Sequence, residues 1–210
     1  EVVASFLRLP KQFTVENYPR VWHLLDFPNV FKNTLLLCVT TVVGAILISS
    51  LAGYKLQRAA YRISRTIYFY FIFSMLIPFY VIMIPVVQTA TAFRLTDSLF
   101  GLWLLYSTFH CPFGIFIFYG FTKSVPLEIE EAAIIDGCGP FKLFFQIVFP
   151  LLKPAVATLA VLFMLWTWND FLLPFLLINS RPLRTITLSF YGFVGLFRVE
   201  WENFITSVVM

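Results

Sequence analysis

Residues 33–54 read NTLLLCVTTVVGAILISSLAGY and contain no charged side chain. A run of about 18 or more residues with this character is long enough to cross the hydrocarbon core of a bilayer as one helix. A helix also satisfies every backbone N–H and C=O group within a single membrane segment. The stretch therefore predicts a transmembrane α-helix and, with it, an all-α membrane protein.

Further segments of the same kind follow along the chain. Their bounds are 66–93, 98–122 and 154–178, with a fifth, truncated run at 204–210. Within them only His110 and Asp170 introduce a side chain that carries charge near neutral pH. Residues 66–93 are long enough to cross as one tilted helix. The prediction is a polytopic transmembrane helical bundle of about five spans, with residues 1–210 forming a single transmembrane domain.

Composition supports a lipid environment for much of the chain. Hydrophobic residues make up 60% of the 210 residues, charged residues 12%, and the mean hydropathy is +0.85. Because soluble domains carry about 25% charged residues, so few charges cannot cover a water-exposed surface. The net charge of +4 therefore reflects membrane topology and lipid headgroups rather than nucleic-acid binding.

Loop charges predict the orientation in the membrane. Loop 55–65 contains four basic residues and no acid, which marks it as cytoplasmic. Residues 1–32 then form an extracytoplasmic segment, and loop 123–153 lies inside. The outer segment 181–198 holds three basic residues. The short loops therefore follow the positive-inside rule, whereas the total number of basic residues on each side does not.

The inner loop 123–153 is the long polar interruption of the chain, and its pattern predicts structure. Pro126 suits the first turn of a helix, and the three Glu residues that follow stabilise the positive end of the helix dipole. Gly137 is placed to end this helix in a left-handed turn. After an elbow at Gly139, Pro140 can open a second short helix. The loop is predicted to form a helix–elbow–helix on the cytoplasmic face, with its acids exposed.

Two uses fit such a surface helix. It can lie in a groove of a partner protein, or it can rest on the bilayer as an interfacial amphipathic helix. Three neighbouring carboxylates would be repelled by anionic headgroups, and this repulsion favours docking on a partner.

A long motif in the same loop resembles a known family. Glu131-Ala132-Ala133 is followed by three residues, Gly137, nine more residues and then Ile147-Val148-Phe149-Pro150. This is similar to the EAA loop of binding-protein-dependent ABC importer permeases, with Phe149 where Leu is usual. Three further segments resemble the carbohydrate branch of that family, and most closely the type of the smaller maltose permease subunit: Asn33-Thr34-Leu35, Ala52-Gly53-Tyr54 and Trp168-Asn169-Asp170-Phe171.

The resemblance implies that this chain is one subunit of a transporter in a bacterial inner membrane, with other proteins performing the remaining functions. The family's six-span pattern implies that a first span precedes Glu1 and that most of the last follows Met210. Two cytoplasmic ATPase subunits, a second permease that forms a heterodimer with this chain, and an extracytoplasmic solute-binding protein are the implied partners. ATP and Mg²⁺ would bind to the ATPase, with no cofactor on this chain. The solute would be a sugar or oligosaccharide.

In the family, the EAA helix docks into a cleft of the ATPase. Carried over residue by residue, the coupling contacts would be Glu131, Ala132, Ala133, Asp136 and Gly137. The small Ala side chains suit a narrow groove, and Gly permits a chain reversal that a β-carbon would hinder.

A second candidate site, for the substrate pathway, consists of Trp166, Trp168, Asn169 and Asp170. Aromatic faces stack on sugar rings, amides bond to hydroxyl groups, and a charge within a span is by default a functional hypothesis. Alternatively, Asp170 and Asn169 tie helices together by hydrogen bonds while the Trp residues pack or lie near the interface. His23, His110 and the three scattered Cys residues show no ligand spacing, so no metal site is expected.

Other classes of function find less support in the sequence. There is no G-x-x-x-x-G-K-[ST] loop, so the chain is expected to be a non-catalytic subunit rather than an ATPase. A membrane-embedded enzyme would need a metal or nucleophile motif such as H-E-x-x-H or G-x-S-x-G, and neither occurs. An ion-coupled secondary transporter subunit is the alternative, with Asp170 as the only acidic residue within the spans.

Overall fold

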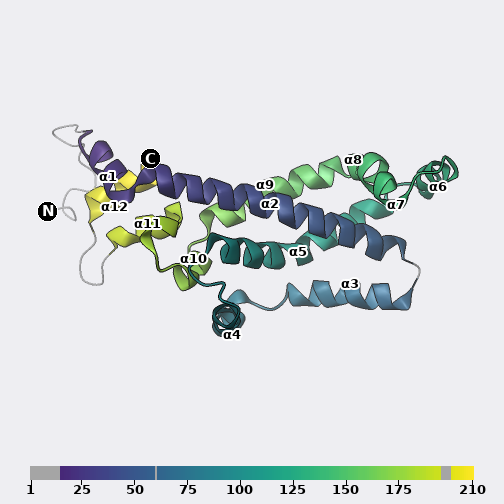
Figure 1. Cartoon of the computed structure of the whole chain (residues 1–210), viewed down its shortest axis with the longest axis horizontal. Helices are drawn as coiled ribbons and strands as arrows, with labels where there is room; N and C mark the ends of the chain where they lie inside the picture. The colour runs from purple at the N-terminus through teal and green to yellow at the C-terminus, as the bar shows by residue number, and fades with distance from the viewer. Residues whose placement is uncertain (1–14, 60, 195–199) are drawn as a thin grey trace, which may run out of the picture.

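The computed structural model describes residues 15–59, 61–194 and 200–210. The regular elements formed by these residues are all helices, which confirms the all-α prediction. Most of the longer helices run along the long axis of an elongated molecule (Figure 1). We name its two ends the α6 end and the α1 end, after the helices that lie there.

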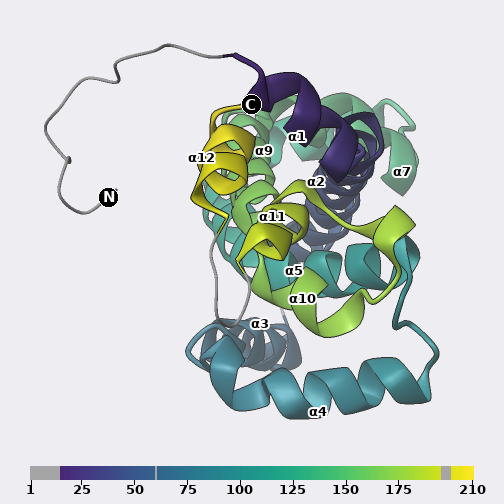
Figure 2. The same cartoon turned by 90° about the vertical axis from the view of Figure 1, so that its left-hand side faces the viewer.

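Two long helices, α2 (Phe27–Arg58) and α5 (Leu99–Lys123), form the spine of the molecule. They pack along one another, and small residues line their contact (Figures 1 and 2). A β-carbon on Gly53 would lie 2.8 Å from Phe118 Cβ, and one on Gly114 would lie 2.6 Å from Ser49 Cβ. The absence of larger side chains lets the two backbones approach closely, as in other membrane helix pairs.

Residues 66–93 are long enough for one tilted helix, but they form two helices instead. α3 (Arg62–Ser74) and α4 (Phe79–Ala92) are separate helices, bent by 103° at the break between them. Pro78 lacks a backbone donor and disfavours helical geometry at Ile77, which explains the break. α4 therefore lies across the long axis, end-on in Figure 1 and lengthwise in Figure 2.

The apolar run 154–178 is also divided. α9 (Lys153–Asn169) ends before Asp170, and the short helix α10 (Leu172–Leu177) follows. Asp170 has an extended backbone, with φ of −72° and ψ of 132°. Its carboxylate accepts hydrogen bonds from the N–H groups of Leu172 and Leu173, both at 3.2 Å. The side chain thus satisfies the first free donors of α10, which favours a new helix start here.

The inner loop adopts the predicted helix–elbow–helix arrangement. α6 (Leu127–Ile135) lies at the tip of the molecule (Figure 1). After the elbow, one helical segment consists of α7 (Pro140–Lys142), a π-helical turn (Leu143–Val148) and α8 (Phe149–Leu151). α9 leaves this segment at 76°.

The opposite end gathers several short elements around the start of α2 (Figure 1). They are α1 (Asn17–Leu25), a 3₁₀ turn (Arg181–Leu183), α11 (Ile186–Phe190), a second 3₁₀ turn (Tyr191–Phe193) and α12 (Trp201–Val209). Part of the predicted outer segment 1–32, residues 1–14, lies outside the described residues. Asn33 Nδ2 donates to Pro182 O at 2.8 Å, and Thr34 Oγ1 accepts from Ile186 N at 2.9 Å. α2 therefore directly holds the loop 178–185 between α10 and α11, which we call the outer loop after the predicted outer segment 181–198.

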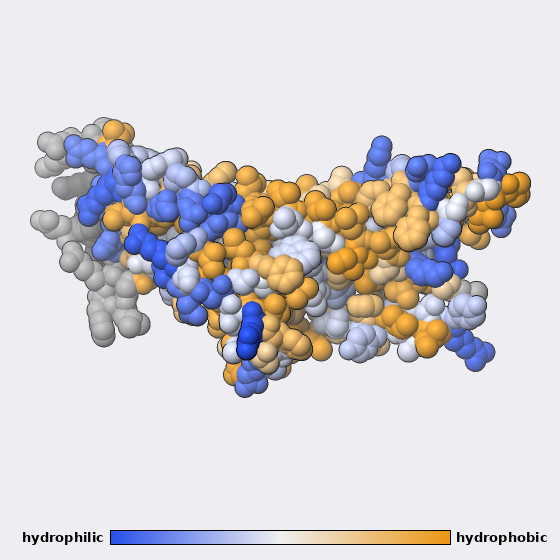
Figure 3. All heavy atoms as spheres, in the orientation of Figure 1, coloured by the Kyte–Doolittle hydropathy of each residue, from blue (hydrophilic) through white to orange (hydrophobic). Residues whose placement is uncertain are grey.

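The surface agrees with a membrane environment. Hydrophobic residues cover the middle of the face shown in Figure 3, and hydrophilic residues gather at both ends. Within the described residues, α2 and α5 are each long and apolar enough to cross a membrane, and there are up to four spans if each bent helix pair counts as one. Such a broad apolar surface is stable where lipid, rather than water, is the solvent.

Candidate coupling surface and solute pocket

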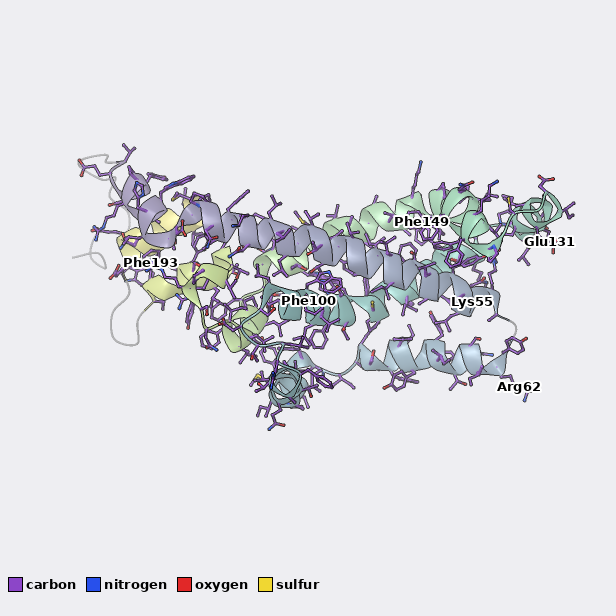
Figure 4. All side chains as sticks on the ribbon, in the orientation of Figure 1. Lys55, Arg62, Phe100, Glu131, Phe149 and Phe193 are labelled. Carbon is purple, nitrogen blue, oxygen red and sulfur yellow. The ribbon has the colours of Figure 1, made fainter. Side chains whose placement is uncertain are left out.

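α6 and its C-terminal turn carry the five residues assigned to coupling, and the structure divides them into two groups. Glu131, Ala132, Asp136 and Gly137 are exposed, whereas Ala133 is only 7% exposed. Figure 4 shows Glu131 on α6 at the tip of the molecule. Four of the five positions are therefore accessible to a partner, and Ala133 packs inward against the chain's own core.

Gly137 ends α6 in a left-handed conformation with φ of 81°, which confirms the predicted cap. Its N–H donates to Ile134 O at 2.9 Å, and the N–H of Cys138 donates to Ala133 O at 3.0 Å. These two bonds form a Schellman motif, which satisfies carbonyls left free at a helix end. A β-carbon at Gly137 would meet no atom within 4 Å. The backbone conformation, and not crowding within the chain, is what requires glycine here.

Glu130 is placed differently from what we predicted. The prediction that the acids of this loop are exposed is wrong for Glu130, which is 5% exposed. Arg58 of α2 forms an ion pair with it at 2.7 Å, and the Tyr54 hydroxyl donates to its other carboxylate oxygen at 2.8 Å. The available signal was the i, i+3 spacing of Glu130 and Ala133, which puts the two buried residues on one face of α6.

The second candidate site is a cavity of about 360 Å³ between α4, α5 and the break after α9. Its lining combines aromatic rings with polar groups, among them Tyr80, Tyr106, Phe109, His110, Trp166 and Asp170. The three residues from α5 were not predicted to belong to a pathway site. Their i, i+3, i+4 spacing, which places them on one helix face, was the signal for them.

α9 brings only two of the four predicted pathway residues to this cavity. Trp166 and Asp170 are four positions apart and line the cavity together. Trp168 instead packs edge-on against Phe31 of α2, with ring centroids 5.9 Å apart. Asn169 is exposed and its Nδ2 donates to the backbone oxygen of Leu165 at 2.8 Å. Because each residue turns a helix by about 100°, positions 166 and 168 face in very different directions.

Asp170 makes the hydrogen bonds expected of a residue that ties helices together. Tyr106 of α5 donates its hydroxyl to Asp170 Oδ2 at 2.7 Å, in addition to the two N–H groups of α10. Thr187 donates to the backbone oxygen of Asp170 at 2.7 Å. The carboxylate therefore lines the cavity while both of its oxygens accept bonds from the chain itself.

His110 and Trp166 form the aromatic wall of the cavity. The His110 ring stacks on Phe163 with centroids 4.7 Å apart, and its Nε2 lies 3.0 Å from Thr167 Oγ1. Trp166 lies edge-on to His110 at 5.8 Å and stays 44% exposed. An accessible flat ring beside hydrogen-bonding groups can bind a ligand that has both apolar faces and hydroxyl groups.

Asp97 anchors the outer loop from the side of α4 and α5. It has a left-handed backbone with φ of 51°, and its carboxylate accepts bonds from Asn179 N at 3.0 Å, from Ser180 N at 2.8 Å and from the Ser180 hydroxyl. These bonds, those from Ser180 first, lower the pKa of Asp97 below its usual value. Among the described residues, no group of three or more His, Cys, Asp or Glu side chains is placed to hold a metal ion.

Comparison with known proteins assigns the family. Residues 28–194 match the family described as the inner membrane component of binding-protein-dependent transport systems. The chain belongs to this family. The permease is 39% identical over 203 residues to the probable starch degradation products transport system permease protein AmyC of Thermoanaerobacterium thermosulfurigenes, an alignment that covers 96% of this chain and 73% of AmyC.

Two other comparisons agree. The permease is 29% identical over 187 residues to the melibiose/raffinose/stachyose import permease protein MelC of Bacillus subtilis, covering 89% of this chain and 68% of MelC. The permease also matches a solved structure, with a TM-score of 0.82 at 24% identity. That structure is of a bacterial ABC transporter involved in the import of the acidic polysaccharide alginate. That match covers 96% of this chain and 75% of the other, and it shows the same fold.

These findings confirm the interpretation from the EAA loop. The permease is an inner-membrane subunit of an ATP-driven, binding-protein-dependent importer. It is not an enzyme, because ATP hydrolysis in such importers belongs to partner ATPase subunits.

Proposed function

We propose that this permease imports a sugar or oligosaccharide, couples to its ATPase through the exposed surface of α6, and forms part of the solute pathway at the Trp166–Asp170 cavity. The position of α6 is the observation that carries the coupling proposal. This short helix, stopped by the left-handed Gly137, stands at one tip of the molecule. Basic loop 55–65 begins at the same end, which supports a cytoplasmic location.

The chemistry of the α6 surface suits a protein groove. Glu131 and Asp136 are exposed beside Ile134 and Ile135, which are 57% and 85% exposed. Full burial of an Ile side chain is worth about 1.5–3 kcal/mol, so covering these two residues would contribute to binding. The small Ala132 lets a partner surface approach the helix closely. The acids add groups that can pair with basic residues of the ATPase.

The sugar proposal rests on the cavity and on the relatives. Trp166 offers an accessible ring for stacking, and Tyr106, His110 and Asp170 lie close by with groups that can bond to hydroxyls. AmyC is named for starch degradation products and MelC for melibiose, raffinose and stachyose. The hydrogen bonds that already occupy Asp170 weaken the case for an ion-coupled carrier, which would need a carboxylate free to bind the ion.

The complete transporter would contain further subunits. A second, different permease would close the pathway across from the cavity, and a solute-binding protein would deliver the sugar to the α1 end. Two ATPase subunits, which would bind ATP and Mg²⁺, would meet α6 and its counterpart on the second permease. No cofactor is proposed for this chain itself.

The test compares Gly137→Arg with Gly139→Arg in the assembled transporter. A β-carbon at either glycine meets no atom within 4 Å, but only Gly137 has positive φ, since Gly139 has φ of −72°. A left-handed conformation costs an ordinary residue about 1–2 kcal/mol, so only Gly137→Arg distorts the cap. We expect the ATPase to co-purify with wild type and Gly139→Arg, and to be lost or uncoupled in Gly137→Arg.

Uptake of labelled maltotriose and raffinose into proteoliposomes tests the solute class. If neither is transported while the ATPase is bound and active, the sugar proposal is rejected and the coupling proposal stands. If no ATPase associates with the wild-type chain in the presence of its second permease, the coupling proposal is rejected.

A further inference from the structure

Glu130, Arg58 and Tyr54 form a polar cluster where α6 meets α2, in which Glu130 is buried and the other two are partly buried. Arg58 Nη2 and Nε lie 2.7 and 2.8 Å from Glu130 Oε1, and the Tyr54 hydroxyl donates to Glu130 Oε2 at 2.8 Å. The side chains of Arg58 and Glu130 are 14% and 7% exposed. Both carboxylate oxygens are therefore held by α2, from two positions about one helical turn apart.

Arg58 also fixes the chain that leads into α6. Its Nη2 donates to Val125 O at 2.7 Å. Val125 and Phe144 of the π-helical turn belong to one buried cluster, and the Phe144 ring lies 5.2 Å from the Tyr54 ring. The end of α2 thus holds α6 itself, the residues before it and the helical segment after it.

Apart from this cluster, α6 mainly contacts the π-helical turn (Leu143–Val148). Of its nine residues, only Glu130 and Ala133 are buried. An apolar contact such as that of Ala133 has no preferred direction and would let the helix pivot. Charge-assisted hydrogen bonds from a planar guanidinium have a fixed geometry, so they keep α6 in one orientation relative to α2.

We propose that Glu130, Arg58 and Tyr54 are the rigid joint that passes a movement of α6 to α2. This inference rests on the proposed coupling role of α6 and names the residues that transmit it. α2 packs along α5 and α9, and at the α1 end it holds the outer loop through Asn33 and Thr34. A displacement of the α6 end of α2 therefore reaches the opposite end of the molecule. The three residues act by positioning α6.

The test measures solute uptake and ATP hydrolysis together, in proteoliposomes that contain the complete transporter and its binding protein. Glu130→Gln keeps the shape of the side chain and removes its charge. Glu128→Gln is the matched control, because Glu128 is an exposed acid on the same helix. Tyr54→Phe removes one bond of the joint and leaves the ion pair intact, so it serves as a mild variant whose folding is least at risk.

We expect ATPase subunits to co-purify with all three variants. The ATP consumed per solute molecule should rise about tenfold in Glu130→Gln, within the usual range of coupling between sites, and less in Tyr54→Phe. Glu128→Gln should keep the wild-type ratio of ATP to solute, because Glu128 lies on the exposed surface of α6 and outside the joint. Any effect of this variant should be weaker binding of the ATPase. Exchanging the charges, with Glu130→Arg and Arg58→Glu together, should restore part of the uptake that either single change removes, an effect that simple loss of folding would not show.

Two outcomes would overturn the joint. One is an unchanged ratio of ATP to solute in Glu130→Gln, with the complex intact. The other applies if Glu130→Gln fails to assemble with its partners. In that case Tyr54→Phe is the test, and an unchanged ratio of ATP to solute in Tyr54→Phe overturns the joint. Failure of the wild-type chain to bind the ATPase is a different result, which would reject the proposed coupling role of α6 itself.

Discussion

Replacing Gly53 by Ala tests how tightly α2 crosses α5. The new β-carbon would lie 2.8 Å from Phe118 Cβ, 3.0 Å from Tyr119 N and 3.1 Å from Ile115 O. Two of these atoms belong to the backbone of α5, which cannot turn aside as a flexible side chain can. The two helices must therefore move apart, and contacts along their whole crossing are weakened.

Two contributions of opposite sign set the size of the effect. Overpacking of a tight core costs about 1–3 kcal/mol, while replacing Gly by Ala in a helix gains up to about 1 kcal/mol. The net loss expected for Gly53→Ala is about 0–3 kcal/mol. Gly120 of α5 is the control, because a β-carbon there meets no atom within 4 Å. Gly120→Ala should therefore gain up to about 1 kcal/mol.

The assay is unfolding of the purified chain in mixed micelles with increasing denaturing detergent, followed by tryptophan fluorescence. The free energy of unfolding should be lower for Gly53→Ala than for Gly120→Ala by about 1–3 kcal/mol, with wild type between them. Equal stabilities of the two variants would refute the close crossing and the packing argument built on it.

Three further predictions concern the cavity and the outer loop. Trp166 lines the cavity, so Trp166→Ala should reduce solute uptake and leave the thermal midpoint nearly unchanged. Trp168 packs on α2, so Trp168→Ala should mainly lower the thermal midpoint. Uptake assays and melting curves that show the reverse would contradict this assignment. Asp170→Asn and Tyr106→Phe should each lower the free energy of unfolding by about 1–3 kcal/mol. Because the two residues share one hydrogen bond, the double variant should lose less than the sum of the two single variants, which a double-mutant cycle measures. For Asp97, the folded state favours the charged form, so its anchoring of the outer loop should be complete at neutral pH and be lost as pH falls through the lowered pKa. Limited proteolysis of that loop should follow this pH dependence, and Asp97→Asn should abolish it.

Helix breaks show what local sequence can and cannot predict. Pro78 lies within an apolar run, and its chemistry alone predicts a weak point in the helix. The angle of 103° between α3 and α4 depends on how each half packs, which no local rule supplies. The break at Asp170 was not predicted, because it depends on capping bonds to α10 and on Tyr106 of another helix.

The sequence by itself determined the membrane class, the helical fold and the helix–elbow–helix of loop 123–153 with its left-handed Gly137. These features follow from composition, from the length of apolar runs and from residues close together along the chain. Only the tertiary structure decided that Trp166 and not Trp168 faces the cavity, and that Ala133 is buried. It also decided that Glu130 is a buried partner of Arg58, 72 positions away in the sequence. Burial and pairing depend on which helix faces lie against each other, and that arrangement results from packing the whole chain.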